Sequence, residues 1–257
     1  MRILLINPNI SEGVTGLIRD EALRNAAPGT ELTVLTAAFG VAYIETRFEA
    51  LVGAYAAALL AAEHGPQHDA VIIAAFGDPG LAGIRELLPV PVLGLTESAL
   101  ASACLLGQRF SIIAISQRIQ PWYREAVQAT GLGGRLASIR ALDAPLADIQ
   151  RVQQDHGVRL QALCQRAVDE DGADVIVLAG APLAGLARSL RGTLPVPVVD
   201  GVSSAVCHAQ SLVALQPGLA RHGSFAPPPV KPNQGLPEAL VRALAGPPAP
   251  HPETRSP

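Results

Sequence analysis

Two predicted loops carry side chains that could exchange protons with a ligand or hold it in place. Tyr43, Glu45 and Arg47 lie together before a predicted helix, and Asp78 lies in the Gly-rich segment Phe76–Gly80. A phenol can donate a proton, and a carboxylate can accept one or hold a ring N–H group. A guanidinium can bind a carboxylate through two parallel hydrogen bonds. These residue types could together support acid–base chemistry on a small ligand.

Each of these residues also has a structural interpretation. Asp78 precedes a proline and could cap the helix that follows it, as turn aspartates do. Tyr43 and Arg47 could belong to a surface loop that leads into a helix, with Glu45 orienting that loop. Asp200, which opens a later helix, is explained fully by N-capping.

Polar residues at other predicted strand ends widen the candidate site. Asn7 and Asn9 follow the first strand, where their amides and the free N–H groups of the next helix suit an anionic or carbonyl oxygen. Thr96 and Ser116 lie at comparable positions and could position ligand oxygens. The alternative for Asn7 and Asn9 is a plain strand-to-helix turn.

The elements that position these residues occur twice in the chain. The segment Asp69–Gly80 reads DAVIIAAFGDPG, and Ala173–Gly185 reads ADVIVLAGAPLAG. Each copy is followed by the sequence LPVPV, at 88–92 and 194–198. An apolar run that ends in small residues and a Gly-rich turn is typical of a buried strand leading into an active-site loop. The repeat therefore predicts two similar halves that face each other across a cleft.

Strands alternate with helices along the chain, which predicts an α/β fold with two pseudo-symmetric parallel-sheet halves. We expect the first half at 1–98, joined by a returning helix at 203–216, and the second half at 99–202. A Pro-rich tail at 217–257 could contain a short helix at 237–245. In parallel sheets, ligands bind at the carboxyl ends of strands, where the candidate residues lie.

Composition excludes several other classes of protein. The chain has 257 residues, of which 49% are hydrophobic and 16% charged, with a net charge of −3. It therefore lacks the basic surface expected of a nucleic-acid-binding protein. No apolar run is long enough to span a membrane, and we expect a cytoplasmic protein. The longest apolar segment, Ala50–Ala62, is interpreted as a buried, Ala-rich helix.

Neither a P-loop nor a GxGxxG motif occurs, and the His and Cys spacings form no metal site, so no cofactor or metal is expected.

Several motifs, in this order and spacing, resemble those of the hydantoin and allantoin racemases of the aspartate/glutamate racemase superfamily. They are Asn7-Pro8-Asn9 with Ser11, Ile44-Glu45, Phe76–Gly80, the ACLLGQR of Ala103–Arg109, and Glu170–Ala173. The resemblance covers roughly residues 1–214. It implies two pseudo-symmetric α/β halves, a small-molecule ligand, no cofactor and a homo-oligomer.

The resemblance also implies a reaction in which two cysteines flank a carbon next to a carbonyl group. One thiolate removes a proton from that carbon and the opposite thiol delivers one. The corresponding positions hold Ala75 and Gly180, which cannot exchange protons. Cys104, Cys164 and Cys207 lie in predicted apolar helices and are interpreted as small buried hydrophobic residues.

The absence of cysteine at positions 75 and 180, where Ala75 and Gly180 stand, has three possible explanations. They are an engineered double substitution, a natural branch of the family with different chemistry, and a non-catalytic binding protein. We expect a racemase-like enzyme that acts on a small cyclic amide or carboxylate ligand, with Asp78, Tyr43 or Glu45 as acid or base. Backbone N–H groups of Phe76, Gly77 and Ala181 would stabilise an enolate-like oxygen. The alternatives are a ligand-binding pseudoenzyme and a lyase or hydrolase. The expected ligand-binding residues are Asn7, Arg47, Ala75, Phe76, Gly77, Thr96, Ser116, Gly180 and Ala181.

Overall fold

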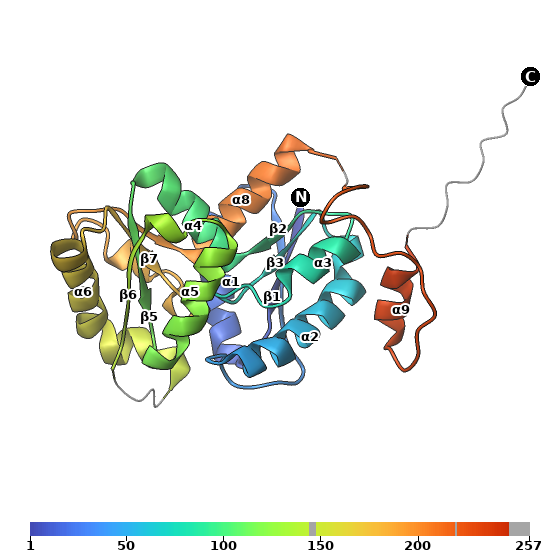
Figure 1. Cartoon of the computed structure of the whole chain (residues 1–257), viewed down its shortest axis with the longest axis horizontal. Coiled ribbons are helices and arrows are strands. Elements are labelled where there is room, and N and C mark those ends of the chain that lie inside the picture. The colour runs from blue at the N-terminus through green and yellow to red at the C-terminus, as the bar shows by residue number, and fades with distance from the viewer. Residues whose placement is uncertain (144–147, 219, 247–257) are drawn as a thin grey trace, which may run out of the picture.

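The computed structural model describes residues 1–143, 148–218 and 220–246, and its core is two four-stranded parallel sheets. The first sheet has the order β2-β1-β3-β4, and the second has the order β6-β5-β7-β8. The first-sheet strands are β1 (Arg2–Asn7), β2 (Glu31–Thr36), β3 (Ala70–Ile73) and β4 (Val92–Gly94). The second-sheet strands are β5 (Phe110–Ala114), β6 (Leu136–Ala141), β7 (Val175–Leu178) and β8 (Val198–Asp200). This confirms the predicted α/β fold class with two similar halves, which lie side by side in Figure 1.

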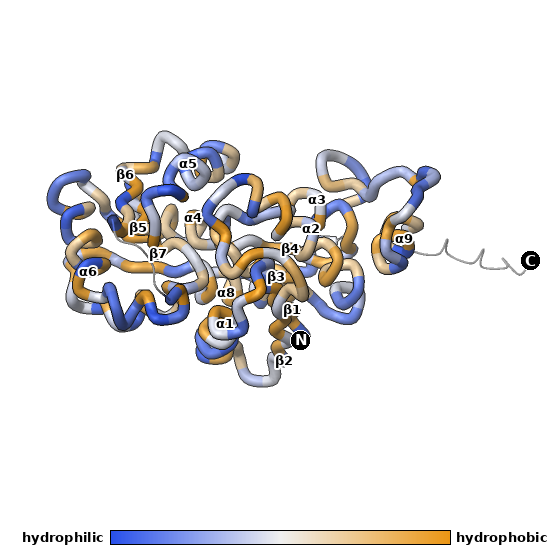
Figure 2. Tube along the Cα trace, turned by 90° about the horizontal axis from the view of Figure 1, so that it is seen from below, coloured by the Kyte–Doolittle hydropathy of each residue, from blue (hydrophilic) through white to orange (hydrophobic). Residues whose placement is uncertain are grey.

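The equivalent strand orders place the repeated segments in equivalent positions. β3 and β7 contain the apolar runs of the repeat, and every residue of both strands is buried. Each pairs with the strand that opens its half, with Ile3 opposite Ala70 and Phe110 opposite Val175. Continuous β-branched and Leu runs form such strands because helices cover both faces of a parallel sheet. In Figure 2 these strands are the orange interior of each half.

Local sequence signals set the starts of several helices. The helices of the first half are α1 (Glu12–Asn25), α2 (Arg47–His64), α3 (Leu81–Leu87) and α4 (Leu95–Leu106). Ser11 caps α1, and Thr46 forms a capping box with Glu49 at the start of α2. Later helices are α5 (Gln120–Ala129), α6 (Val152–Asp171), α7 (Leu186–Ser189), α8 (Gly201–Leu215) and α9 (Glu238–Leu244). Asp200 accepts a hydrogen bond from the Ser203 N–H at 2.9 Å, which confirms its predicted role as the cap of α8.

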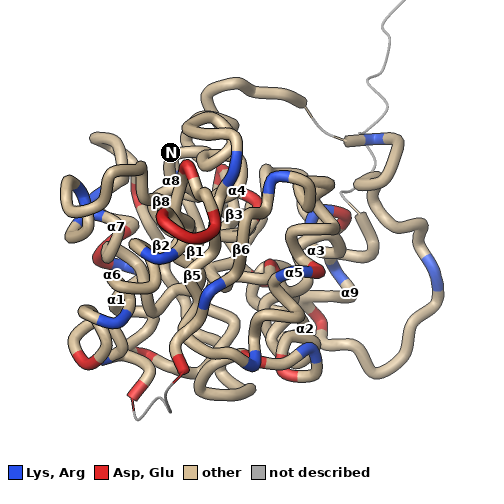
Figure 3. Tube along the Cα trace, turned by 60° about the vertical axis from the view of Figure 1, so that its left-hand side comes forward, with Lys and Arg blue, Asp and Glu red and all other residues tan. Residues whose placement is uncertain are grey.

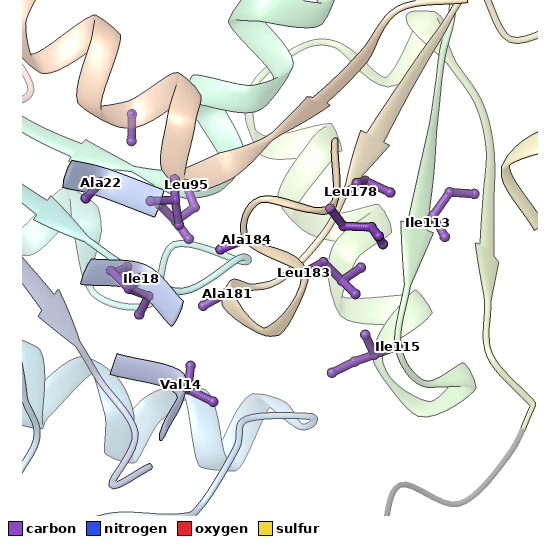
Figure 4. Close-up of a cluster of buried hydrophobic side chains, with 14 of the residues drawn as sticks. Val14, Ile18, Ala22, Leu95, Ile113, Ile115, Leu178, Ala181, Leu183 and Ala184 are labelled. Atoms are coloured by element: carbon purple, nitrogen blue, oxygen red, sulfur yellow. The ribbon is translucent and has the colours of Figure 1, made fainter. Parts of the chain in front are cut away.

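The largest hydrophobic cluster extends from one half into the other. Val14, Ile18 and Ala22 of α1 lie against Ala181 and Ala184, which follow β7 in the second half, as Figure 4 shows. Helix α8 packs against α1 and α4 and contacts strands of both sheets. The predicted division at residues 98 and 99 falls within α4, and the domain limits stay a prediction.

A buried polar network also joins the two halves. Glu21 of α1 is 2% exposed and its carboxylate accepts hydrogen bonds from Arg188 of α7, from Ser203 of α8 and from Asn25. A carboxylate removed from water needs such donors to remain charged. Acidic and basic residues are dispersed along the chain among uncharged segments, as Figure 3 shows.

Two sequence-based expectations about burial are wrong. Within the predicted buried helix Ala50–Ala62, Leu51 is 67% exposed and Tyr55 is 45% exposed. Cys207 is exposed on α8 and Cys104 is half-buried, whereas Cys164 is buried as expected. The periodicity of a helix identifies its apolar faces but does not say whether another element covers them. Among the described residues, no helix is both long and apolar enough to span a bilayer.

Candidate active site

A small cavity lies between the carboxyl ends of the strands of the two sheets. The first half contributes Asn9, Tyr43, Ile44, Ala74, Ala75 and Phe76. The second half contributes Ile115, Ile119, Tyr123, Gly180, Ala181 and Pro182. Loops after β1, β3, β5 and β7 thus meet at the positions where parallel sheets bind ligands. The cavity volume is about 40 Å³, more than the ~10–15 Å³ that a single bound water requires.

Ala75 and Gly180, where the resemblance implies thiols, both line this cavity from opposite halves. Their backbones differ. Gly180 has φ 106° and ψ 143°, a region that is essentially restricted to glycine, whereas Ala75 has no positive φ. A Cβ atom at position 180 would lie 3.8 Å from the Tyr123 hydroxyl oxygen, so it meets no clash, but the backbone would be strained. The two positions are therefore not equally able to carry a cysteine.

Tyr123 is a cavity residue that the sequence analysis missed. It lies on α5, is 2% exposed, and its ring packs at a tilt of 54° against Phe76, with centroids 4.7 Å apart. Burial raises the pKa of Tyr123 far above its ordinary value, and the charges of Asp78 and Glu45 add to that effect. The hydroxyl therefore remains protonated and serves as a proton or hydrogen-bond donor. No local sequence signal identifies it, because its position depends on how α5 docks onto the first half.

Tyr43 reaches the same cavity from the loop after β2. Burial raises the pKa of Tyr43, and the nearby Glu45 carboxylate raises it further through its charge and as a hydrogen-bond acceptor. Glu45 itself does not line the cavity, and its backbone N–H donates to the Glu49 carboxylate at 2.8 Å. Tyr43 and Glu45 are thus neighbours, with the phenol nearer the cavity.

Asp78 lies outside the cavity lining and accepts hydrogen bonds at the start of α4. Its two carboxylate oxygens accept hydrogen bonds from the Thr96 and Glu97 N–H groups, at 2.8 Å and 3.0 Å. It therefore caps α4, and the predicted cap of the next helix, α3, is wrong. Burial raises the pKa of Asp78 to about 7, while the hydrogen bonds from the Thr96 and Glu97 N–H groups oppose that rise. Asp78 shapes the loop behind Phe76 instead of contacting the cavity.

A hydrogen bond joins Thr96 and Gly77. The Gly77 N–H donates to the Thr96 hydroxyl oxygen at 2.6 Å, so this N–H group is not available to a ligand oxygen. The indole of Trp122 covers Gly77 so closely that an added Cβ would lie 2.2 Å from the ring. The N–H groups of Phe76 and Ala181 donate to no other described residue. Of the three expected oxyanion donors, two remain available.

The two asparagines after β1 differ in their contacts. Asn7 is fully buried and its amide nitrogen lies within hydrogen-bond distance of Asn9 Oδ1, the Ser11 carbonyl oxygen and Thr15 Oγ1. Asn7 therefore holds the loop and does not line the cavity. Asn9 lines it, and its Nδ2 group donates to no other described residue. Asn9 is thus the amide available to a ligand carbonyl.

Arg47 and Ser116 lie away from the cavity lining. Arg47 forms a two-pronged ion pair with Glu125 of α5, and both side chains are 55% exposed. Its partner is thus a carboxylate of the protein, across the boundary between the halves. Ser116 caps the turn after β5 by accepting from the Arg118 N–H at 3.2 Å.

Two further observations concern the rest of the described structure. A larger cavity of about 600 Å³ lies between β6 and α6, and none of the predicted site residues is among those that line it. In the part of the chain that is described, no group of three His, Cys, Asp or Glu side chains is arranged to hold a metal ion.

Comparisons with known proteins identify similar sequences and structures. A family model described as Asp/Glu/Hydantoin racemase matches residues 3–209. A hydantoin racemase of Paenarthrobacter aurescens is 37% identical over 236 residues, which cover 90% of this chain and 99% of the relative. The solved allantoin racemase from Klebsiella pneumoniae is 36% identical with a TM-score of 0.89, covering 93% of this chain and 98% of that one. The allantoin racemase from Pseudomonas fluorescens is 35% identical with a TM-score of 0.84, covering 91% and 100%.

Proposed function

The chain belongs to the Asp/Glu/hydantoin racemase family, and from that premise we propose that it acts at a carbon next to a carbonyl group in a small cyclic amide. Relatives named hydantoin racemase and allantoin racemase support this class of ligand. The Asn9 amide and the Phe76 and Ala181 N–H groups could bind the carbonyl oxygens of such a ring.

One observation carries the proposed chemistry. Among the residues that line the cavity, Tyr43 and Tyr123 are the side chains that can exchange a proton, and each comes from a different half. Two phenols would therefore replace the two thiols that the resemblance implies. Phenols are weaker acids than thiols by roughly 1.5 pKa units, so this route needs help from neighbouring groups.

Tyr43 would act with Glu45. The oxygen of Tyr43 takes the proton from the carbon as its own hydroxyl proton passes to the Glu45 carboxylate. The electron pair of the C–H bond moves into the carbonyl group, and the enolate oxygen accepts from the Phe76 and Ala181 N–H groups. The Tyr123 hydroxyl then delivers its proton to the carbon. Glu45 releases its proton to solvent, and the Tyr123 phenolate takes one up from solvent, which restores both groups. Because the pKa of Tyr123 is raised, its hydroxyl stays protonated across the neutral range.

The test is proton exchange in heavy water. The full chain is incubated with 5-substituted hydantoins and with allantoin, and deuterium entry at the carbon next to the carbonyl is followed by NMR. We expect exchange above the uncatalysed rate, and a loss of at least about tenfold in both Tyr43→Phe and Tyr123→Phe. Tyr55→Phe, which changes the third tyrosine of the chain on the surface of α2, is the matched control and should leave the rate unchanged. Calorimetric binding without exchange would instead identify a ligand-binding protein.

A lyase is the second candidate, favoured by the pKa shifts of the two phenols. Both pKa values are raised, so the cavity offers two proton donors, and no residue among those that line it is a base with a lowered pKa. Such a site suits a reaction in which the carbanion forms by loss of carbon dioxide. The electron pair of the broken C–C bond becomes the enolate, and Tyr123 protonates the carbon.

Product analysis separates the two reactions. A racemase incorporates deuterium into recovered substrate with no change of mass other than the isotope. A lyase releases bicarbonate from 2-substituted malonates or their half-amides and leaves one deuterium in the product. Release of bicarbonate without exchange into hydantoins would replace the first proposal by the second.

A further inference from the structure

The larger cavity, between β6 and α6, is a second place where a small molecule could bind. Its volume of about 600 Å³ lies within the roughly 300–1,000 Å³ that is typical of ligand pockets. β6 is an edge strand of the second sheet, and α6 packs against it at the left of Figure 1. Of the described residues, none lines both this cavity and the smaller one. We call it the β6–α6 cavity, and it is distinct from the candidate active site.

Three arginines line the β6–α6 cavity. Arg140 lies on β6, and Arg159 and Arg166 lie on α6. Arg159 and Arg166 are seven residues apart, which is about two turns of the helix, so both side chains leave it on the same face. Ala162 lies between them on that face, and its small side chain leaves the space open. The guanidinium groups therefore border a space that a ligand can enter.

Two of these arginines are held by carboxylates that do not line the cavity. Arg140 donates from Nε and Nη2 to Asp171 and Glu170, at 2.6 to 2.8 Å. Arg166 donates from Nε and Nη2 to Glu170, at 2.9 and 3.1 Å. The Nη1 groups of both arginines donate to no described residue. Asp171 and Glu170 thus fix the two guanidinium groups and balance their charge, and they leave donors for a ligand.

Arg159 and Asp143 line the β6–α6 cavity without a partner of opposite charge among the described residues. Asp155, one turn before Arg159 on α6, pairs instead with Arg151 at 3.4 Å. Arg159 and Asp143 also form no ion pair with each other, although they line the same cavity. A molecule with both a carboxylate and an N–H group can bridge two such side chains, because a guanidinium donates hydrogen bonds and a carboxylate accepts them.

The wall of the β6–α6 cavity is partly apolar. Leu142 is buried, and Leu163 of α6 is half-buried. An aliphatic group of a ligand that lies against these two side chains is removed from water, which favours binding. The cavity thus offers a cation, an anion and an apolar surface to one small molecule.

We propose that the β6–α6 cavity binds a small carboxylic acid that carries an N–H donor and an aliphatic side chain. The ligand carboxylate would accept hydrogen bonds from Arg159, with the Nη1 group of Arg166 on the same helix face as a second donor. The ligand N–H group would donate to Asp143, and the aliphatic group would lie against Leu142 and Leu163. α-Amino acids and their N-acyl derivatives share these features, the former through an ammonium group and the latter through an amide.

The β6–α6 cavity and the candidate active site share one segment of the chain. Gln117 and Gln120 line the β6–α6 cavity, whereas Ile119 and Tyr123 line the smaller one. A ligand in the β6–α6 cavity would therefore contact the segment that leads into α5 and carries Tyr123. Binding there does not depend on which reaction the smaller cavity catalyses, so calorimetry tests it without an activity assay.

The test is isothermal titration calorimetry of the full chain with four related compounds. L-leucine and N-acetyl-L-leucine have all three features, 4-methylpentanoate lacks the nitrogen, and L-leucinamide lacks the carboxylate. We expect at least one of the first two to bind with a Kd of about 1 mM or lower, and the tighter of them shows whether an ammonium or an amide is preferred. We expect 4-methylpentanoate and leucinamide to bind at least about tenfold more weakly, because each lacks one charge-assisted hydrogen bond.

Variants of the lining residues locate the binding. Arg159→Gln should weaken binding of the tighter leucine compound by at least about tenfold. Arg19→Gln, which changes an exposed arginine of α1 outside the cavity, is the matched control and should leave the Kd unchanged. Asp143→Ala should weaken binding of the leucine compound but not of 4-methylpentanoate, which has no N–H group. Ala162→Glu, which puts a carboxylate between Arg159 and Arg166, replaces Arg159→Gln if circular dichroism shows that variant to be unfolded.

Four results would overturn the proposal. The first is a wild-type chain that binds neither leucine nor N-acetyl-leucine at millimolar concentrations. The second is an Arg159→Gln variant that loses no more affinity than Arg19→Gln, which would place the binding elsewhere in the molecule. The third is equal affinity for 4-methylpentanoate or leucinamide, which would show that the N–H group or the carboxylate is not recognised. The fourth is unchanged binding of the leucine compound by Asp143→Ala, which would remove the proposed acceptor.

Discussion

The carboxylate of Asp78 accepts a hydrogen bond from the backbone N–H of Thr96 at 2.8 Å, and this bond ties the loop after β3 to the start of α4. Asp78 has φ 49°, a left-handed conformation that is uncommon outside glycine. An added Cβ at Gly94 would lie 2.2 Å from the Asp78 carboxyl carbon, so the two segments are in close contact. The loop behind the cavity and the beginning of α4 therefore form one unit.

Asp78 should make the stability of the protein depend on pH. Burial raises the pKa of Asp78 to about 7, above the value of 3.8 in an unstructured chain. The folded state therefore holds this proton more tightly, and the contribution of Asp78 to stability is present below pH 4 and lost as pH rises through 7. We expect Asp78→Ala to lower the free energy of unfolding, by on the order of 1–2 kcal/mol more at pH 5 than at pH 8. Urea denaturation at both pH values measures the difference, and a cost that grows with pH would contradict it.

Substitution of Gly180 should destabilise the fold more than substitution of Ala75, its counterpart in the repeat. Its φ of 106° favours glycine, so we expect Gly180→Ala and Gly180→Cys each to destabilise the fold by about 1–3 kcal/mol. Ala75→Cys should cost less than about 1.5 kcal/mol, since it adds one atom at an ordinary backbone position. Gly83→Ala in α3 is the control for adding a methyl group, because nothing lies within 4 Å of the new Cβ. Thermal denaturation compares the four variants, and a Gly180→Ala protein as stable as Gly83→Ala would show that position 180 does not require glycine.

The ring and the hydroxyl of Tyr123 should contribute separately. The ring is buried and packs against Phe76, so Tyr123→Ala should cost about 3–5 kcal/mol of stability. The hydroxyl faces the cavity, so Tyr123→Phe should change stability by less than about 0.5 kcal/mol. Chemical denaturation of both variants measures this. A large stability loss in Tyr123→Phe would mean that its hydroxyl serves the fold and would remove it from the proposed chemistry.

Glu21 should be the most sensitive charged residue between the halves. Its side chain is 3% exposed and receives hydrogen bonds from Arg188 and Ser203. Arg188→Ala removes the charge that compensates this buried carboxylate, and we expect a loss of about 2–4 kcal/mol. Arg24 lies 3.6 Å from the same carboxylate but is 55% exposed, so Arg24→Ala should cost less than about 1 kcal/mol. Similar unfolding midpoints for the two variants would show that the network does not hold the halves together.

Much of the fold and part of the site can be predicted from the sequence, because the relevant signals are local. The buried strands, the Gly-rich turns and the repeat of Asp69–Gly80 predict two similar parallel sheets. The same repeat predicts that Ala75 and Gly180 end equivalent strands. These features follow from hydrophobic pattern and turn chemistry over a few residues, and the structure places both residues at one cavity.

Contacts between distant segments decide the rest. Tyr123 lines the cavity because α5 docks across the boundary between the halves, and no neighbouring residue signals this. Asp78 caps α4 instead of the helix that follows it, and Arg47 pairs with Glu125 of the other half. Leu51 is exposed although its helix has the composition of a buried one. A sequence pattern states what a side chain can do, but its partner depends on packing between elements that are far apart in the chain, and that packing exists only in the folded structure.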